Sequence, residues 1–299
     1  MARRNRISFV VEEPLLLSLL LLLLLVQLTQ DVHSLSTTDL RSAIHHLSAS
    51  PPKETLESLS NVRIPRRDGG SILGYHAKPS ASSTSSSSSG GKGGLPVLVL
   101  IHEFFGLTKS ICDKAEGLAA DIGCHVIAPD TFRGESSTFI PKCIYLALST
   151  PQDRVDRDLD DVLQWASTQP QSMDVSRLAV MGFCYGGGKA IQYTTGCHPE
   201  ASTVVCYGKP VTDVQQLARL QKPVCGVFGA NDVQFPPSLL ESFRIGMTDA
   251  GVQFDLQVYP GVGHAFWKDM DQIRRGEEPQ RSAYKQVTTF LKTNLMEEP

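Results

Sequence analysis

Short apolar runs alternate with longer amphipathic segments along most of the chain. The runs predicted as strands are residues 72–76, 95–101, 125–129, 177–183, 203–208, 223–230 and 252–260. The segments predicted as helices are residues 109–123, 153–169, 185–195, 212–219, 237–249 and 283–295. Strands that are apolar along their whole length and alternate with helices indicate a parallel sheet covered on both faces. We therefore expect an α/β fold with a doubly wound, mostly parallel sheet.

The domain boundaries follow from the composition of the segments outside this pattern. Residues 80–94 are almost entirely serine and glycine, which cannot bury apolar surface and predict a flexible loop. Residues 35–61 are too short and polar to carry a core of their own, so we interpret 80–94 as a surface insertion rather than a linker. The prediction is one domain over residues 62–299 after a polar segment at 35–61.

The first 34 residues have the layout of a secretory signal peptide. Three arginines in the first six residues precede an apolar block at 15–26, and small or polar residues follow it. The block is shorter than the roughly 20 apolar residues that span a bilayer. Val32 and Ser34 suit the −3 and −1 positions of a cleavage site, so residues 1–34 are predicted to be removed on entry to the secretory pathway. An uncleaved anchor and an organelle-targeting leader remain alternatives.

Composition and charge narrow the class of partner. Hydrophobic residues make up 41% and charged residues 20% of the 299 residues, which is ordinary for a globular protein. The formal net charge is −3 and basic clusters are short, which argues against binding to nucleic acid. We expect a monomer that acts on a small molecule, with no membrane contact once the leader is removed.

Seven cysteines occur at irregular spacing and without a CxxC motif. Three lie inside apolar runs and are predicted to be buried thiols: Cys124, Cys206 and Cys225. Three others have more polar neighbours, and their pairing is left open: Cys112, Cys143 and Cys197. The pair Cys197–His198 lacks the spacing of a structural zinc site, so no metal is expected.

The seventh cysteine has a different setting. Cys184 follows the apolar run 177–183, precedes a helical segment and lies between Gly182 and Gly186 in a G-x-C-x-G pattern. This pattern is typical of the strained strand-turn-helix elbow that exposes a hydrolase nucleophile, and the helix N-terminus favours the thiolate. A glycine-rich turn with an incidental thiol is the alternative, and the five residues alone do not decide between them.

A candidate base and a candidate acid at other strand ends favour the interpretation of Cys184 as a nucleophile. His264 follows the run 252–260 in a glycine-rich loop, and Asp232 follows the run 223–230. Ligands collect at the carboxyl ends of parallel strands, and a nucleophile–acid–histidine order is typical of this fold. The other candidates are placed on the surface or on helix and strand faces: His198, Asp213, Asp249 and Asp255. The sequence thus predicts a Cys184–Asp232–His264 triad.

Five motifs resemble the dienelactone hydrolase family of α/β-hydrolases, in the family's order. They are IHEFFG (101–106), APDTFRGE (128–135), MGFCYGGG (181–188), GANDVQFP (229–236) and GVGHAFW (261–267). The resemblance covers the chain from about residue 62 to its end. It implies Cys184 as nucleophile, His264 as base and Asp232 as the acid that orients it.

The resemblance also implies roles near the nucleophile. Glu103 corresponds to the carboxylate that contacts the resting nucleophile, which would keep the thiol protonated until substrate arrives. The backbone N–H groups of Phe104 and Tyr185 correspond to the oxyanion hole. These assignments predict an acyl-transfer site at the sheet edge.

Substrate recognition is less well defined by the sequence. Arg133 occupies a position that grips the substrate carboxylate in the family, and Lys268 stands where a second arginine would be. Lysine lacks the bidentate fork of arginine, so carboxylate recognition should differ. Several aromatic residues suggest an apolar pocket entrance: Phe104, Phe105, Phe132, Tyr185 and Trp267.

We therefore predict a hydrolase of esters or lactones that works through a thioester and needs no cofactor or metal. A non-catalytic binding protein with the same fold is the first alternative. A thiol redox protein, with Cys197 as the resolving cysteine for Cys184, is the second.

Overall fold

The computed structural model describes residues 55–79, 94–137, 139–169 and 173–296. The chain divides into two units, Met1–Lys53 and Glu54–Pro299, and all described residues belong to the second. The predicted leader and all of the Ser/Gly insertion except Gly94 lie outside the described residues, so both stay predictions. None of the described helices is long and apolar enough to cross a bilayer.

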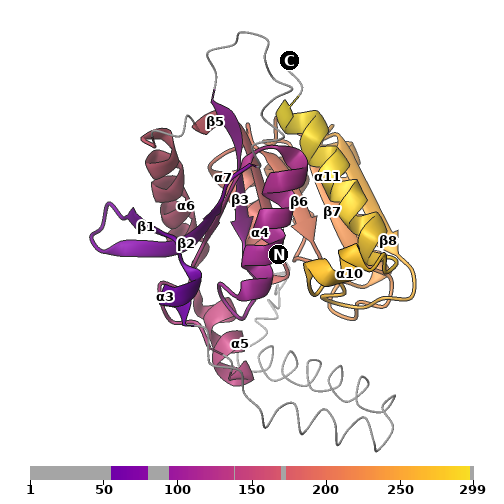
Figure 1. The fold of residues 1–299 in the computed structure, drawn as a ribbon. Helices are drawn as coiled ribbons and strands as arrows, with labels where there is room; N and C mark the ends of the chain where they lie inside the picture. Colours follow the sequence, from indigo (N-terminus) through magenta and orange to yellow (C-terminus); the bar gives the residue numbers. More distant parts are fainter. Residues whose placement is uncertain (1–54, 80–93, 138, 170–172, 297–299) are drawn as a thin grey trace, which may run out of the picture. The chain divides into compact units, whose positions relative to one another are not determined.

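Within the described residues, eight strands form one sheet in the order β1-β2-β4-β3-β5-β6-β7-β8 (Figure 1). The strands are β1 (Val62–Pro65), β2 (Ser71–Ala77), β3 (Leu95–Ile101), β4 (His125–Pro129), β5 (Met173–Phe183), β6 (Ser202–Cys206), β7 (Val224–Gly229) and β8 (Phe254–Tyr259). From β4 to β8 all neighbours are parallel, while β1 pairs with β2, and β2 with β4, antiparallel. The predicted fold is confirmed.

Helices cover both faces of this sheet (Figure 1). They are α3 (Leu56–Leu59), α4 (Lys109–Ile122), α5 (Ile140–Ser149), α6 (Gln152–Ser167), α7 (Tyr185–Gly196), α8 (Val214–Leu217), α9 (Pro237–Asp249), α10 (Met270–Arg274) and α11 (Gln280–Met296). Helices α4 and α11 pack together against one face, and α6 and α7 pack together against the other. Four elements were not predicted: β1, α3 and α10 have only four or five residues, too few to establish a period, and the ten-residue α5 was not recognised.

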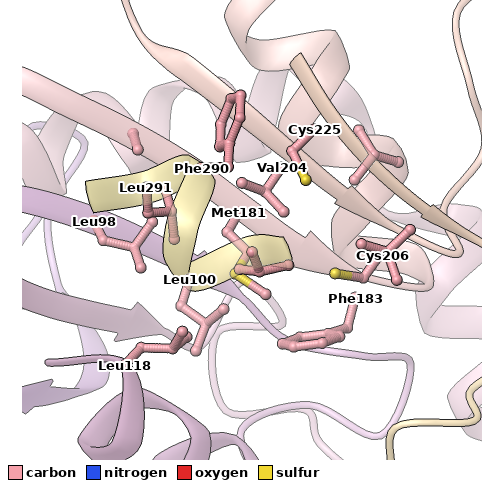
Figure 2. Close-up of a cluster of buried hydrophobic side chains, with 14 of the residues drawn as sticks. Leu98, Leu100, Leu118, Met181, Phe183, Val204, Cys206, Cys225, Phe290 and Leu291 are labelled. Atoms are coloured by element: carbon pink, nitrogen blue, oxygen red, sulfur yellow. The ribbon is translucent and has the colours of Figure 1, made fainter. Parts of the chain in front are cut away.

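Alternation along the central strands assigns their side chains to the two faces. Leu98 and Leu100 of β3 and Met181 of β5 are fully buried toward the cluster that contains side chains of α4 and α11. Figure 2 shows them beside Leu118 of α4 and Leu291 of α11. The alternate residues of the same strands join a second cluster with α6 and α7. Because both faces are buried, the strands read as continuous apolar runs in the sequence.

The cysteines are all free thiols. The predicted burial is confirmed for Cys124, Cys206 and Cys225. Cys112 and Cys143 are also buried, despite their polar neighbours in sequence, because they lie on the inward faces of α4 and α5. Cys197 is exposed at the C-terminal end of α7.

A buried histidine pair links β2 to β4 and is expected to make stability depend on pH. His76 is 6% exposed, its Nε2 lies 3.0 Å from Nδ1 of His125, and it contacts the edge of Trp165. Burial, followed by the charges of His125 and Lys78, lowers the pKa of His76 to about 4. The unfolded chain, with a histidine pKa of about 6.5, therefore binds the proton over a range in which the folded chain does not.

The contribution of His76 to the free energy of unfolding is thus expected to be fully present above pH 6.5. It should be lost as the pH falls from 6.5 to about 4, by up to about 3 kcal/mol. Urea unfolding of wild type and His76→Gln across this range measures the effect. The wild type should lose more free energy of unfolding on acidification than the variant. Parallel losses in the two proteins would show that the histidine is not responsible.

Candidate active site

Cys184 lies at the sharp turn between β5 and α7. It is the N-cap of α7 with φ 51° and ψ −114°, a conformation that non-glycine residues rarely adopt. Its backbone N–H donates to the Cys206 carbonyl oxygen at the end of β6, at 2.9 Å. The turn therefore holds the half-buried thiol at the carboxyl edge of the sheet, as the G-x-C-x-G pattern predicts.

The glycines around Cys184 allow α7 to approach the strand ends. A Cβ on Gly186 would lie 2.3 Å from the Ile101 carbonyl oxygen, and one on Gly182 would lie 2.0 Å from the Gly186 carbonyl oxygen. Both obstacles are backbone atoms, which cannot rotate away. The spacing of glycines in the motif is therefore a packing requirement of the turn.

Gly186→Ala is expected to lower the free energy of unfolding by about 3 kcal/mol, because α7 must move away from the end of β3. Gly196→Ala is the matched control in the same helix, since a Cβ there meets nothing within 4 Å. Urea unfolding of the two variants measures the difference. Equal stability of both variants would contradict this account of the motif.

His264 and Asp232 lie next to the thiol, each from the loop after a different strand. His264 Nε2 is 3.0 Å from Cys184 Sγ, and its Nδ1 is 2.7 Å from Asp232 Oδ2. Burial lowers the pKa of His264, but Cys184 and Asp232 outweigh it and raise that pKa to about 10. Both neighbours therefore favour the protonated, positively charged form of the imidazole. The three residues predicted as a triad are brought together.

The Glu103 carboxylate is directed toward residues that the sequence did not suggest. Its Oε1 lies 3.3 Å from the Tyr207 hydroxyl and 4.0 Å from Lys114 Nζ. Tyr207 is fully buried and packs its ring against His264. The single proton of its hydroxyl can be donated to Glu103 Oε1 or to the Trp267 carbonyl oxygen, which lies at 3.2 Å. The sulfur of Cys184 is instead paired with His264, so the expected Glu103–thiol contact is not the arrangement observed.

The oxyanion role predicted for the backbone N–H groups of Tyr185 and Phe104 stays a prediction. Tyr185 is the first residue of α7, where backbone N–H groups have no acceptor within the helix. Phe104 lies in the loop after β3, and the side chain of His102 holds that loop in place through two hydrogen bonds. The Thr131 amide donates to His102 Nε2 at 3.1 Å, which places the ring proton on Nδ1, and Nδ1 donates to the Glu103 carbonyl oxygen at 2.7 Å. The fully buried His102 thus orients the segment that carries Phe104.

Arg133 is engaged by carboxylates of the protein itself, and its predicted contact with a substrate carboxylate stays a prediction. Its Nε and Nη2 bind the buried Asp158 of α6, with Nη2 at 2.5 Å from Oδ1, and Nη1 lies 3.3 Å from Asp68. A substrate carboxylate would have to displace a buried partner. We interpret Arg133 as a bridge between α6 and the β1–β2 turn.

Trp267 and Phe132 belong to the core rather than to a pocket entrance. Trp267 is fully buried between the edges of Phe183 and Tyr284, and Phe132 is 1% exposed. Tyr185, Phe104 and Phe105 are half-buried and can meet a ligand. Lys268 is exposed, with its backbone fixed by Gln272 and Ser110, so its predicted role stays a prediction.

The other acids and histidines lie elsewhere, as predicted. His198 follows the C-terminal end of α7 and pairs with Asp160 and Glu200. Asp213 caps α8, Asp249 ends α9 and Asp255 lies in the edge strand β8.

Cys197 cannot resolve a disulfide with Cys184. The two residues cap opposite ends of α7, a helix of 12 residues or about 18 Å. Disulfide formation requires Cα atoms within about 7 Å. The redox alternative therefore loses the partner that the sequence suggested for it.

Sequence reasoning missed Tyr207, Lys114 and His102. Tyr207 and His102 directly follow strands β6 and β3, so their places at the same sheet edge were a usable signal. Lys114 lies three residues after Ile111 and four before Leu118, on the apolar side of α4, which marks a buried charge.

Two other features do not compete with this site. No group of three or more metal-ligating side chains occurs among the residues that the structure describes. A groove of about 480 Å³ lies between β8 and α11 and is lined mainly by uncharged polar side chains such as Gln257 and Thr289. It contains none of the paired titratable groups found at Cys184, which are what mark a reactive site.

Comparisons with known proteins agree with this description. The model of the "Dienelactone hydrolase family" matches residues 85–295. Proteins named "Putative carboxymethylenebutenolidase" from Salmonella typhimurium strain LT2 and Escherichia coli strain K12 are each 32% identical over 67% of this chain and 75% of their own length. The crystal structure of a "Putative Dienelactone Hydrolase" from Klebsiella pneumoniae superposes with a TM-score of 0.63 and 27% identity, over 77% of this chain and 96% of that one.

Proposed function

The chain belongs to the dienelactone hydrolase family and is a carboxylic ester or lactone hydrolase, and we propose that it works through Cys184, His264 and Asp232 with a thioester intermediate. The observation that carries the proposal is the continuous hydrogen-bonded chain from Asp232 through His264 to the Cys184 sulfur, at 2.7 and 3.0 Å. All three side chains come from loops at the carboxyl edge of one sheet.

The reaction follows from these positions. With the thiol proton on His264, the Cys184 thiolate attacks the carbonyl carbon and forms a tetrahedral adduct. His264 then gives its proton to the leaving alkoxide oxygen as the C–O bond breaks, which leaves an acyl thioester. A water molecule, deprotonated by His264, adds to the thioester carbonyl, and expulsion of the Cys184 thiolate releases the carboxylic acid. Asp232 holds the imidazole in place and stabilises its charge throughout.

The N–H groups of Tyr185 and Phe104 are proposed to bind the oxyanion. The positive end of α7 adds to this stabilisation because Tyr185 is its first residue. One such donor is typically worth about 3 kcal/mol in the transition state. The buried His102 serves this function indirectly, by fixing the loop of Phe104.

The proposed substrates are small esters or lactones. The half-buried rings of Phe104, Phe105 and Tyr185 provide apolar contact. Lys268 is the one cation of the predicted carboxylate-binding pair whose side chain remains exposed, because Arg133 is held by Asp158. We therefore propose that a substrate carboxylate, where present, is bound loosely and by Lys268.

Rapid mixing with p-nitrophenyl acetate, acid quenching and peptide mass mapping test the proposal. We expect one acetyl group on the peptide containing Cys184 at early times, and no acetylation of Cys197 in the same sample. Turnover with the acetyl group on a different residue, or with none on Cys184, would refute the thioester pathway. Loss of the advantage of carboxylate-bearing lactones in Lys268→Met, with neutral esters unaffected, would support the role of that lysine.

We propose, from the sequence alone, that residues 1–34 direct the chain to the secretory pathway and are then removed, and that the mature chain is a monomer. N-terminal sequencing of the protein recovered from its native source tests the leader. Sedimentation equilibrium tests the oligomeric state.

A further inference from the structure

Lys114 carries an ammonium group into the core beside the proposed active site. The residue is 0% exposed although it lies in the first half of an amphipathic helix, α4. Its Nζ lies 4.0 Å from Glu103 Oε1 and 4.4 Å from the centre of the Phe183 ring, and it has no hydrogen-bond partner among the residues that the structure describes. Burying a charged group in this way is costly, so a compensating interaction is expected.

Glu103 is the compensating carboxylate. The Phe183 face adds a cation–π contact, and the remaining ionisable groups that face Nζ are Cys206 of β6 and Asp269 before α10. Burial lowers the pKa of Lys114, while Glu103, Cys206 and Asp269 act to raise it. Lys109 of the same helix differs, because it is exposed and ion-paired to Asp113 at 2.6 Å.

Tyr207 connects this pair to the nucleophile. Its hydroxyl lies 3.3 Å from Glu103 Oε1, and its ring centre lies 5.5 Å from that of His264. Burial raises the pKa of Tyr207, and negative charge on Glu103, Cys206 or Cys184 raises it further. The carboxylate and the developing thiolate thus act on the same buried phenol. Two anions so placed repel each other unless a cation offsets one of them.

We propose that Lys114 is a positioning residue that acts through Glu103: its ammonium holds the carboxylate beside Tyr207, away from the sulfur, and offsets its charge so that the Cys184 thiolate can form. This inference rests on the proposed function, because it assigns Lys114 a part in preparing that nucleophile. It explains why Glu103 is turned toward Lys114 and Tyr207 while the sulfur pairs with His264.

The pH dependence of Cys184 alkylation by iodoacetamide tests the proposal, with the modified peptide identified by mass. In Lys114→Met, the pH of half-maximal rate should rise by about one unit, because a nearby positive charge is lost. In Glu103→Gln it should fall, because a nearby negative charge is lost. Because Lys114 acts through Glu103, the double variant should match Glu103→Gln alone. The exposed Lys109→Met should match wild type.

These outcomes separate the proposal from a purely structural role. A packing defect, or a direct effect of Lys114 on the sulfur, would still raise the pH of half-maximal rate when Lys114→Met is added to Glu103→Gln. Such a rise would overturn the action through Glu103. An unchanged profile in folded Lys114→Met overturns the proposal as well. If Lys114→Met cannot be recovered folded, the alkylation profile of Glu103→Gln alone tests the proposal. An unchanged profile in Glu103→Gln would overturn it. Alkylation is measured without ester turnover, so these results stand apart from failure of the proposed hydrolysis, which would appear as activity in Cys184→Ala.

Discussion

Cys184→Ala is expected to lower kcat for ester hydrolysis by at least about 10³-fold, because the thioester cannot form without the sulfur. The substitution removes a half-buried side chain and leaves the backbone turn with its bond to Cys206 in place. The N–H groups of Tyr185 and Phe104 remain, so any residual rate reflects oxyanion binding alone. Initial rates with p-nitrophenyl acetate, on protein shown to be folded by circular dichroism, measure the change.

Cys197→Ala is the matched control for this experiment. That thiol is exposed and lies at the far end of α7, so its loss should leave kcat and KM within twofold of wild type. Substantial activity in Cys184→Ala, or a comparable loss in Cys197→Ala, would refute Cys184 as the nucleophile.

The sequence was sufficient to predict the sheet and the triad because both depend on local patterns. Strands buried on two faces appear as apolar runs, and residues that follow such runs share one edge of a parallel sheet. Cys184, Asp232 and His264 each follow a different run, and the structure brings them within hydrogen-bond distance. No long-range information beyond strand order was needed for this step.

The substrate-binding residues were harder to predict because their partners come from distant segments. Arg133 binds Asp158, which lies 25 residues later in a helix whose acidic face looks solvent-exposed in the sequence. Trp267 lies three residues from His264, yet it packs inward between Phe183 and Tyr284. Proximity in sequence to a reactive residue therefore does not determine which way a side chain points.

Lys114 is the opposite case, a residue expected at the surface that lies buried beside the site. A lysine in an amphipathic helix is usually assigned to the solvated face, yet this one lies on the apolar side. Its partner Glu103 lies 11 residues earlier, in the loop between β3 and α4. Only the tertiary structure adds Tyr207 and Phe183 to the pair. The helical periodicity alone was enough to mark Lys114 as unusual, although not to identify its function.

Asp232→Asn is expected to lower kcat by about 10⁴-fold with little change in KM, because it alters the proton position on His264. The Gln234 backbone N–H donates to Asp232 Oδ1 at 2.9 Å, so the amide oxygen of asparagine takes that position. The amide nitrogen then faces His264 Nδ1 and donates a proton to it. Nδ1 becomes an acceptor, and the imidazole proton is forced onto Nε2, where it faces the Cys184 sulfur. An imidazole in this tautomer cannot accept the thiol proton.

Asp249→Asn is the control, since Asp249 is exposed at the end of α9 and should leave the kinetics unchanged. Alkylation of Cys184 at neutral pH provides a second readout, and it should slow in Asp232→Asn because the thiolate is no longer formed by transfer to His264. A kcat within tenfold of wild type would mean that His264 is oriented by other contacts. The rings of Tyr207 and Phe235, whose centres lie 5.5 and 5.7 Å from that of His264, would then be sufficient to hold the imidazole. Asp232 would have no catalytic part.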